Sequence, residues 1–176
     1  MQKVKLPVEV EPFRAAKRRL DYEGILLKEQ MPRLAESTLA INKDAEVWIR
    51  FAIDPQGLVV MTGKAVTEVT LECQRCRGEL VQPLVVEFQY SPVDQNNQAD
   101  ELPEAYEPLE LNENHEFHLY RLIEDEFLLA LPLIAKHSIE SCGIQQVVQT
   151  FGEIKVQEEE KQPNPFAILR SLKKDN

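Results

Sequence analysis

Three strand-like segments follow one another along the chain with only short turns between them. Residues 46–53 alternate apolar and polar side chains, which is the period of a half-buried β-strand. The sequence Asp-Pro-Gln-Gly at 54–57 is a strong turn signal, and strand patterns resume at 58–72 and at 80–90. Successive strands without intervening helical patterns favour an antiparallel meander over βαβ units.

Helical patterns are confined to the flanks of this strand region. Residues 117–131 have the strongest helical pattern, and Pro132 ends it. A short helix is expected from Pro12 to Arg19, since proline suits a first helical turn. We therefore predict an α+β fold. A curved antiparallel sheet or partial β-barrel over residues 22–111 would pack against one main helix, with peripheral N- and C-terminal helices.

Length and composition suit one domain with an appendage. The chain has 176 residues, of which 43% are hydrophobic, enough for a packed core. We predict a single α+β domain over residues 1–152, followed by a charged linker and a short C-terminal helix over 153–176. No apolar stretch approaches the roughly 20 residues of a membrane helix, and the N-terminus lacks a signal-peptide pattern. We expect a cytoplasmic protein without a membrane partner.

The formal net charge of −10 argues against a general nucleic-acid coat protein. We expect no DNA partner, and any RNA contact must come from a local basic patch. A basic protein is the easier electrostatic match, and the acidic residues 100–116 are a candidate surface for it.

A CxxC motif, Cys73 to Cys76, lies between two of the predicted strands. A redox dithiol is disfavoured because such a cysteine usually begins a helix, whereas Arg77-Gly78 favours a turn. A zinc knuckle suits a tight turn between strands, and His137 and Cys142 would complete a Cys3His site. The alternative is that the cysteines pack the hairpin tip without metal.

The helix 117–131 carries an acidic residue among apolar ones. At 100° per residue, Glu126 falls inside the apolar stripe, whereas Glu124 and Asp125 fall outside it. A carboxylate on a buried face needs a partner, and we predict Arg75 or Arg77. The alternative is that this face is a groove for a partner protein.

Two further groups are candidate binding residues. The candidates for RNA or anion contact are Arg75, Arg77, Lys17, Arg18 and Arg19. The candidates for partner binding are Glu126, Phe166, Leu169 and Leu172.

No catalytic motif stands out. The sequence lacks GxGxxG, GxxxxGK[ST], HExxH and GxSxG. We therefore predict a non-enzymatic protein. An RNA-modifying or RNA-cleaving enzyme would require a pocket that brings Glu126 within hydrogen-bond reach of a cysteine or histidine.

Six collinear segments resemble the YceD family, the large ribosomal RNA subunit accumulation proteins. They are residues 1–7, 19–24, 70–76, 102–108, 124–132 and 163–167. The resemblance implies a role in synthesis, processing or stability of the large-subunit (23S) ribosomal RNA, and it brings no enzymatic activity. The partners implied are ribosomal RNA or large-subunit assembly intermediates, contacted directly or through a basic protein. The alternative is an adapter or chaperone for a basic ribosomal protein or assembly factor, without RNA contact.

Overall fold

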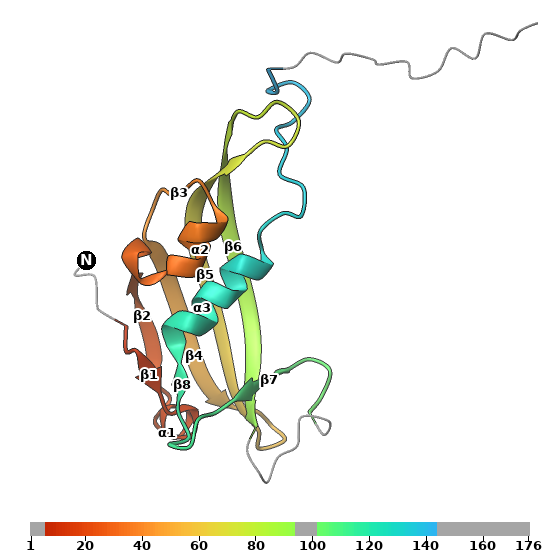
Figure 1. Ribbon diagram of the computed structural model, residues 1–176. Coiled ribbons are helices and arrows are strands. Elements are labelled where there is room, and N and C mark those ends of the chain that lie inside the picture. The colour runs from red at the N-terminus through yellow and green to blue at the C-terminus, as the bar shows by residue number, and fades with distance from the viewer. Residues whose placement is uncertain (1–5, 94–101, 144–176) are drawn as a thin grey trace, which may run out of the picture. The chain divides into compact units, whose positions relative to one another are not determined.

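A computed structural model describes residues 6–93 and 102–143 (Figure 1). The helices are α1 (Pro12–Arg18), the 3₁₀ turn η1 (Lys28–Gln30), α2 (Pro32–Ser37) and α3 (Leu119–Leu129). The strands are β1 (Glu9–Val10), β2 (Asp21–Leu26), β3 (Ala40–Ile41), β4 (Ala45–Ile53), β5 (Val59–Glu72), β6 (Glu79–Val93), β7 (Glu107–Glu110) and β8 (Phe117–His118).

The main sheet is long, open and mostly antiparallel. Its strand order is β2-β4-β5-β6-β7, and β3 also pairs with β5. Only β7 runs parallel to its neighbour, pairing with the last residues of β6. A separate two-stranded ribbon joins β1 to β8. The predicted α+β fold with a mostly antiparallel sheet is confirmed, and the sheet does not close into a barrel.

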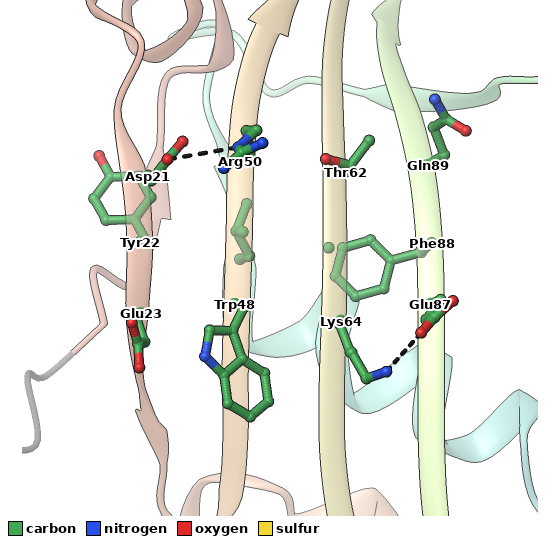
Figure 2. A pocket seen from close by; sticks show the side chains of 12 residues that line it. Asp21, Tyr22, Glu23, Trp48, Arg50, Thr62, Lys64, Glu87, Phe88 and Gln89 are labelled. Carbon is green, nitrogen blue, oxygen red and sulfur yellow. Dashed lines mark hydrogen bonds and ion pairs between the residues drawn. The ribbon is translucent and has the colours of Figure 1, made fainter.

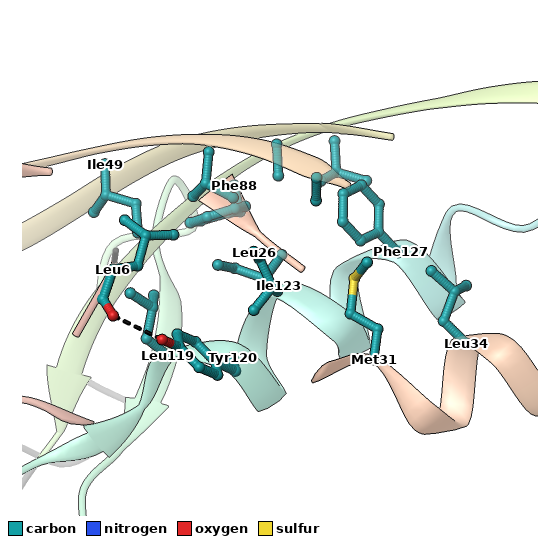
Figure 3. Packing of buried hydrophobic residues seen from close by; sticks show 14 of the residues in the cluster. Leu6, Leu26, Met31, Leu34, Ile49, Phe88, Leu119, Tyr120, Ile123 and Phe127 are labelled. Atoms are coloured by element: carbon teal, nitrogen blue, oxygen red, sulfur yellow. Dashed lines mark hydrogen bonds between the residues drawn. The ribbon is translucent and has the colours of Figure 1, made fainter. Parts of the chain in front are cut away.

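The core lies between one face of this sheet and the helices. Along β4, alternate residues are buried, and Val47, Ile49 and Phe51 face the helices. Ile123 and Phe127 of α3 are fully buried against that face, as Figure 3 shows. Each such apolar side chain contributes about 1.5–3 kcal/mol by leaving water. The long strands and α3 therefore stabilise each other as one layered unit.

Helix α2 was not expected from the sequence, and it changes which acid of α3 is buried. The expectation that Glu124 lies outside the buried stripe is wrong: Glu124 is 3% exposed, while Glu126 is half-buried. The physical reason is that α3 packs on two neighbours, the sheet and α2. A prediction made at 100° per residue assumes one buried helix face, so it includes the side that packs on the sheet and omits the side that packs on α2.

The carboxylate of Glu124 is satisfied by the start of α2. Its Oε1 accepts the backbone N–H groups of Arg33 and Leu34 at 2.7 and 3.1 Å. Its Oε2 accepts Nε of Arg33 at 2.9 Å. The N-cap residue Met31 supplies no side-chain acceptor, so an acid from α3 takes the role of a helix cap.

Some expectations fall on residues outside the described ranges. The C-terminal helix with Phe166, Leu169 and Leu172 and the division at residue 152 remain predictions. The predicted N-terminal helix is α1, which buries Ala15 and Ala16 and leaves Lys17, Arg18 and Arg19 exposed.

Candidate metal centre

The β5–β6 hairpin ends in the tight turn that carries the CxxC motif. Cys73 N–H donates to the carbonyl of Gly78 at 2.9 Å, and Arg77 N–H donates to the carbonyl of Cys73 at 2.8 Å. Arg77 adopts a left-handed backbone with φ 61°. These bonds fold the chain back on itself, so that Cys73 and Cys76 point to the same side. The predicted strand–turn context of the motif is confirmed.

The segment after α3 runs back along β6 to this hairpin tip (Figure 1). The backbone N–H of Gln74 donates to the carbonyl of Ala135 at 2.8 Å. The backbone N–H of His137 lies 3.5 Å from Sγ of Cys73. These contacts hold His137 and Cys142 against a turn more than 60 residues earlier in the chain.

Four potential metal ligands meet at this junction: Cys73, Cys76, His137 and Cys142. Their ligand atoms all lie within 4.8 Å of one another. Around a tetrahedral zinc with bonds of roughly 2.0–2.3 Å, ligand atoms lie about 3.6–3.8 Å apart. The distance from Cys76 Sγ to His137 Nδ1 is 3.4 Å. The donor set and its spacing fit zinc after small adjustments, and the four predicted ligands do come together.

The tautomer of His137 favours metal binding. Its Nε2 lies 2.9 Å from the carbonyl oxygen of Glu79. A carbonyl can only accept, so Nε2 carries the proton and Nδ1 presents its lone pair to Cys76. Metal-bound histidines commonly donate their other ring N–H to such an oxygen. This bond also raises the pKa of His137.

The thiols of the pair are unequal in acidity. Burial raises the pKa of Cys73, but backbone N–H groups of Cys76, His137 and Arg75 outweigh it and lower the pKa to about 5. The backbone N–H of Gly78 lowers the pKa of Cys76. Burial and the neighbouring thiols Cys73 and Cys142 raise it by more, so the pKa of Cys76 lies above its ordinary value. Zinc binds thiolates, so Cys73 is already in the form the metal requires.

Arg75 is directed into this cluster. Its Nε donates to Cys142 Sγ at 3.1 Å, and its Nη2 donates to the carbonyls of His137 and Ser138 at 2.7 and 3.2 Å. Three thiolates around a zinc ion would carry a net negative charge, which this guanidinium would offset. Arg75 holds the segment that carries His137 and Cys142 through these hydrogen bonds.

The predicted pairing of Glu126 with Arg75 or Arg77 is wrong. Tyr90 of β6 donates its hydroxyl to Glu126 Oε1, and Arg77 pairs with Glu72 at 2.7 Å. Arg75 and Arg77 lie at the hairpin tip, where the first is held by the ligand segment and the second by its own hairpin. Neither contacts Glu126, and no described hydrogen bond joins Glu126 to a cysteine or histidine.

Residues 61–173 match the sequence model of the family described as large ribosomal RNA subunit accumulation protein YceD. The chain belongs to the YceD family. A YceD protein of Haemophilus influenzae, named large ribosomal RNA subunit accumulation protein, is 51% identical over 173 residues. That alignment covers 98% of this chain and 99% of the relative. No solved structure matches this YceD chain.

The four candidate ligands lie inside the part of the chain that matches the YceD model.

Among residues 6–93 and 102–143, the helices are all too short or too polar to span a membrane. Sequence reasoning missed the exposed side chain of Trp48, which lies on the sheet face opposite the one that packs on α3. The signal was present in the alternation of β4, because Trp48 falls between the buried Val47 and Ile49.

Proposed function

We propose that this chain is a non-catalytic ribosome-biogenesis factor that supports synthesis, processing or stability of large-subunit (23S) ribosomal RNA. The observation that carries this proposal is the near full-length similarity to a protein named for large ribosomal RNA subunit accumulation. The proposed place of action is the cytoplasm, on ribosomal RNA or large-subunit assembly intermediates.

Depletion of the protein tests this function. The ratio of 23S to small-subunit ribosomal RNA should fall in depleted cells and return when the chain is supplied again. Pulse labelling then separates the three roles: slower appearance indicates synthesis, precursor build-up indicates processing, and faster decay indicates stability. An unchanged ratio contradicts the proposal.

The second candidate is an adapter that acts through a basic protein without touching RNA. The acidic balance of the chain favours it, since the net charge of −10 repels phosphate at long range. Crosslinking in growing cells discriminates between the two. Crosslinks to ribosomal RNA support direct contact, and crosslinks to protein alone support the adapter.

We propose zinc as the cofactor of the Cys3His cluster, in a structural role. The four residues would fill all four positions of a tetrahedral ion, which is typical of structural rather than catalytic zinc sites. The ion would join the β5–β6 hairpin tip to the segment after α3. The ligands are Cys73, Cys76, His137 and Cys142.

Elemental analysis tests the zinc proposal. The purified protein should contain about one zinc per chain, and the Cys76→Ser variant should contain far less. Release of zinc by a chelator should lower the melting temperature of the parent and leave the variant almost unchanged. If the parent protein contains no bound zinc after purification in zinc-containing buffer, the proposal is contradicted.

A further inference from the structure

One face of the main sheet carries no helix in the described part of the chain. Its centre is a shallow hollow of ≈ 620 Å³ across β2, β4, β5 and β6 (Figure 2). A second hollow of ≈ 570 Å³ involves Glu46, Val66, Glu68 and Pro83 of the same sheet. Glu46 and Val66 of the second hollow lie two residues from Trp48 and Lys64 of the first on the same strands, so the two hollows are neighbours on one face. We refer to the pair as a trough.

Trp48 lies in the first hollow, and its side chain is 37% exposed. Glu23 on β2 is its direct cross-strand neighbour, and Lys64 on β5 is opposite on the other side. Glu46 lies two residues away on the same strand and therefore on the same face. The indole is thus next to two exposed carboxylates.

Most basic groups that line the two hollows are engaged with acids, but Lys28 at the second hollow takes part in no ion pair among the described residues. Lys64 pairs with Glu87 at 2.7 Å, so its charge is directed away from Trp48. Two further pairs lie at the hollows, namely Arg50–Asp21 and Lys43–Glu68. Glu23 and Glu46 take part in no ion pair among the described residues. The first hollow therefore has the unpaired acid Glu23, and the second has two unpaired acids, Asp44 and Glu46, against the single base Lys28. Each hollow is left with an excess of negative charge.

Apolar side chains complete the surface beside Glu46. Ile25 and Val66 are its cross-strand neighbours, and Val85 is the neighbour of Val66. Val85 is 54% exposed. A row of this kind accommodates the aliphatic stem of a lysine or arginine while a carboxylate binds its charged end.

We propose that this trough, which we call the Trp48 face, binds a lysine- and arginine-rich polypeptide segment. A cationic side chain would stack on the indole of Trp48, a favourable cation–π contact. Glu23 and Glu46 would pair with that cation or its neighbours. The charge of the face disfavours RNA phosphate and a second copy of this chain. The inference deepens the proposed function. It rests on that function only for the kind of basic partner expected in the cell, namely a protein of large-subunit assembly.

Fluorescence provides a direct measurement, because Trp48 is the single tryptophan of the chain. The full chain is titrated with a short lysine/arginine peptide, with an acidic peptide of the same length, and with a single-stranded RNA of similar length. The basic peptide should change the emission of Trp48 in a saturable, salt-sensitive manner. The acidic peptide should produce no change. Tighter binding of the RNA than of the basic peptide would overturn the proposal.

Matched variants separate this face from the general acidity of the chain. The double variant Glu23→Gln/Glu46→Gln should weaken peptide binding about tenfold. The control Glu29→Gln/Glu36→Gln removes the same charge from exposed positions that line neither hollow, and it should change binding less than about twofold. Equal weakening by the two double variants would show that binding follows net charge alone, and the Trp48 face would be rejected.

A third variant tests the indole itself. Trp48→Leu is followed through the anisotropy of a labelled basic peptide, and binding should weaken about threefold or more. We expect each variant to fold, because the replaced side chains are exposed. Circular dichroism checks this. Undiminished binding by Trp48→Leu would remove the cation–π contact from the proposal. Because binding is measured with purified protein, its failure is distinct from an unchanged ribosomal RNA ratio in cells.

Discussion

Glu124 on α3 binds Arg33 on α2 twice, through the backbone N–H at 2.7 Å and through the side-chain Nε at 2.9 Å. The two residues are 91 positions apart, and the carboxylate is almost fully buried. Asp125 binds the same guanidinium at 2.5 Å from an exposed position. One arginine thus links α2 to two adjacent acids of different burial.

Replacement of Glu124 by Ala should destabilise the fold by about 2–4 kcal/mol, because two backbone donors of α2 and one guanidinium lose their acceptor. The matched control Asp125→Asn should cost less than about 1 kcal/mol, since an exposed ion pair contributes little. Urea denaturation measures both values. Equal losses would show that burial of Glu124 is not what makes the contact important.

Gly63 is required by the ring of Phe88 on the neighbouring strand. A Cβ atom built at position 63 would lie 2.1 Å from Cε2 of that ring, and the ring is buried. Gly63→Ala should therefore destabilise the protein by about 1–3 kcal/mol. The same change in a Phe88→Leu background should cost clearly less, since the smaller side chain leaves room. Additive effects in this double-mutant cycle would contradict the predicted clash.

Glu126 should make a pH-dependent contribution to stability. Burial raises its pKa, and the hydrogen bond from Tyr90 only partly opposes this. A raised pKa means that the stabilising contribution is complete below the unfolded-state value of 4.5 and is lost as the pH rises through the folded-state pKa. The unfolding free energy of Glu126→Gln, relative to the parent, should therefore increase as the pH rises above 4.5 and through the folded-state pKa of Glu126.

Tyr90→Phe provides the companion measurement. Without the phenol donor the pKa of Glu126 should rise further, so the loss of stability should extend to higher pH than in the parent. A parent and a Glu126→Gln variant with parallel pH profiles would contradict the assigned shift.

Arg75 should influence metal retention although it is not a ligand. Arg75→Gln removes the positive charge and the bonds to Cys142 Sγ and to two carbonyls of the ligand segment. If zinc is bound, the affinity measured by competition with a chromophoric chelator should fall roughly tenfold or more. Arg77→Gln is the control, since Arg77 pairs with Glu72 in the same turn. Equal affinities of the two variants would contradict this role.

Zinc removal should loosen one region and leave the rest folded. Hydrogen exchange should accelerate at the amides of Gln74 and Cys142, which bond across or within the ligand-bearing segments. Amides of β4, paired on both sides, should keep their protection. Loss of protection throughout β4 would show that the metal supports the whole fold.

The sequence by itself determined the three long strands β4, β5 and β6, the turn at 54–57 and most of α3. It did not indicate the short strands β1, β3 and β8, and Phe117–His118, expected in the helix, form β8. Alternation along β4 and the CxxC motif between strand patterns are local signals, because side-chain period and turn chemistry depend on neighbouring residues. The same information sufficed to nominate Cys73, Cys76, His137 and Cys142, since few residue types bind zinc.

Only the tertiary structure decided which acid is buried and which arginine supports the cluster. Glu124 is buried because α2 packs beside α3, and this second neighbour leaves no periodic trace in the helix sequence. Arg75 is directed inward because His137, 62 positions later, passes the hairpin tip. The uncovered face around Trp48 likewise depends on where the helices pack. Long-range packing sets these features, and no local pattern along the chain encodes it.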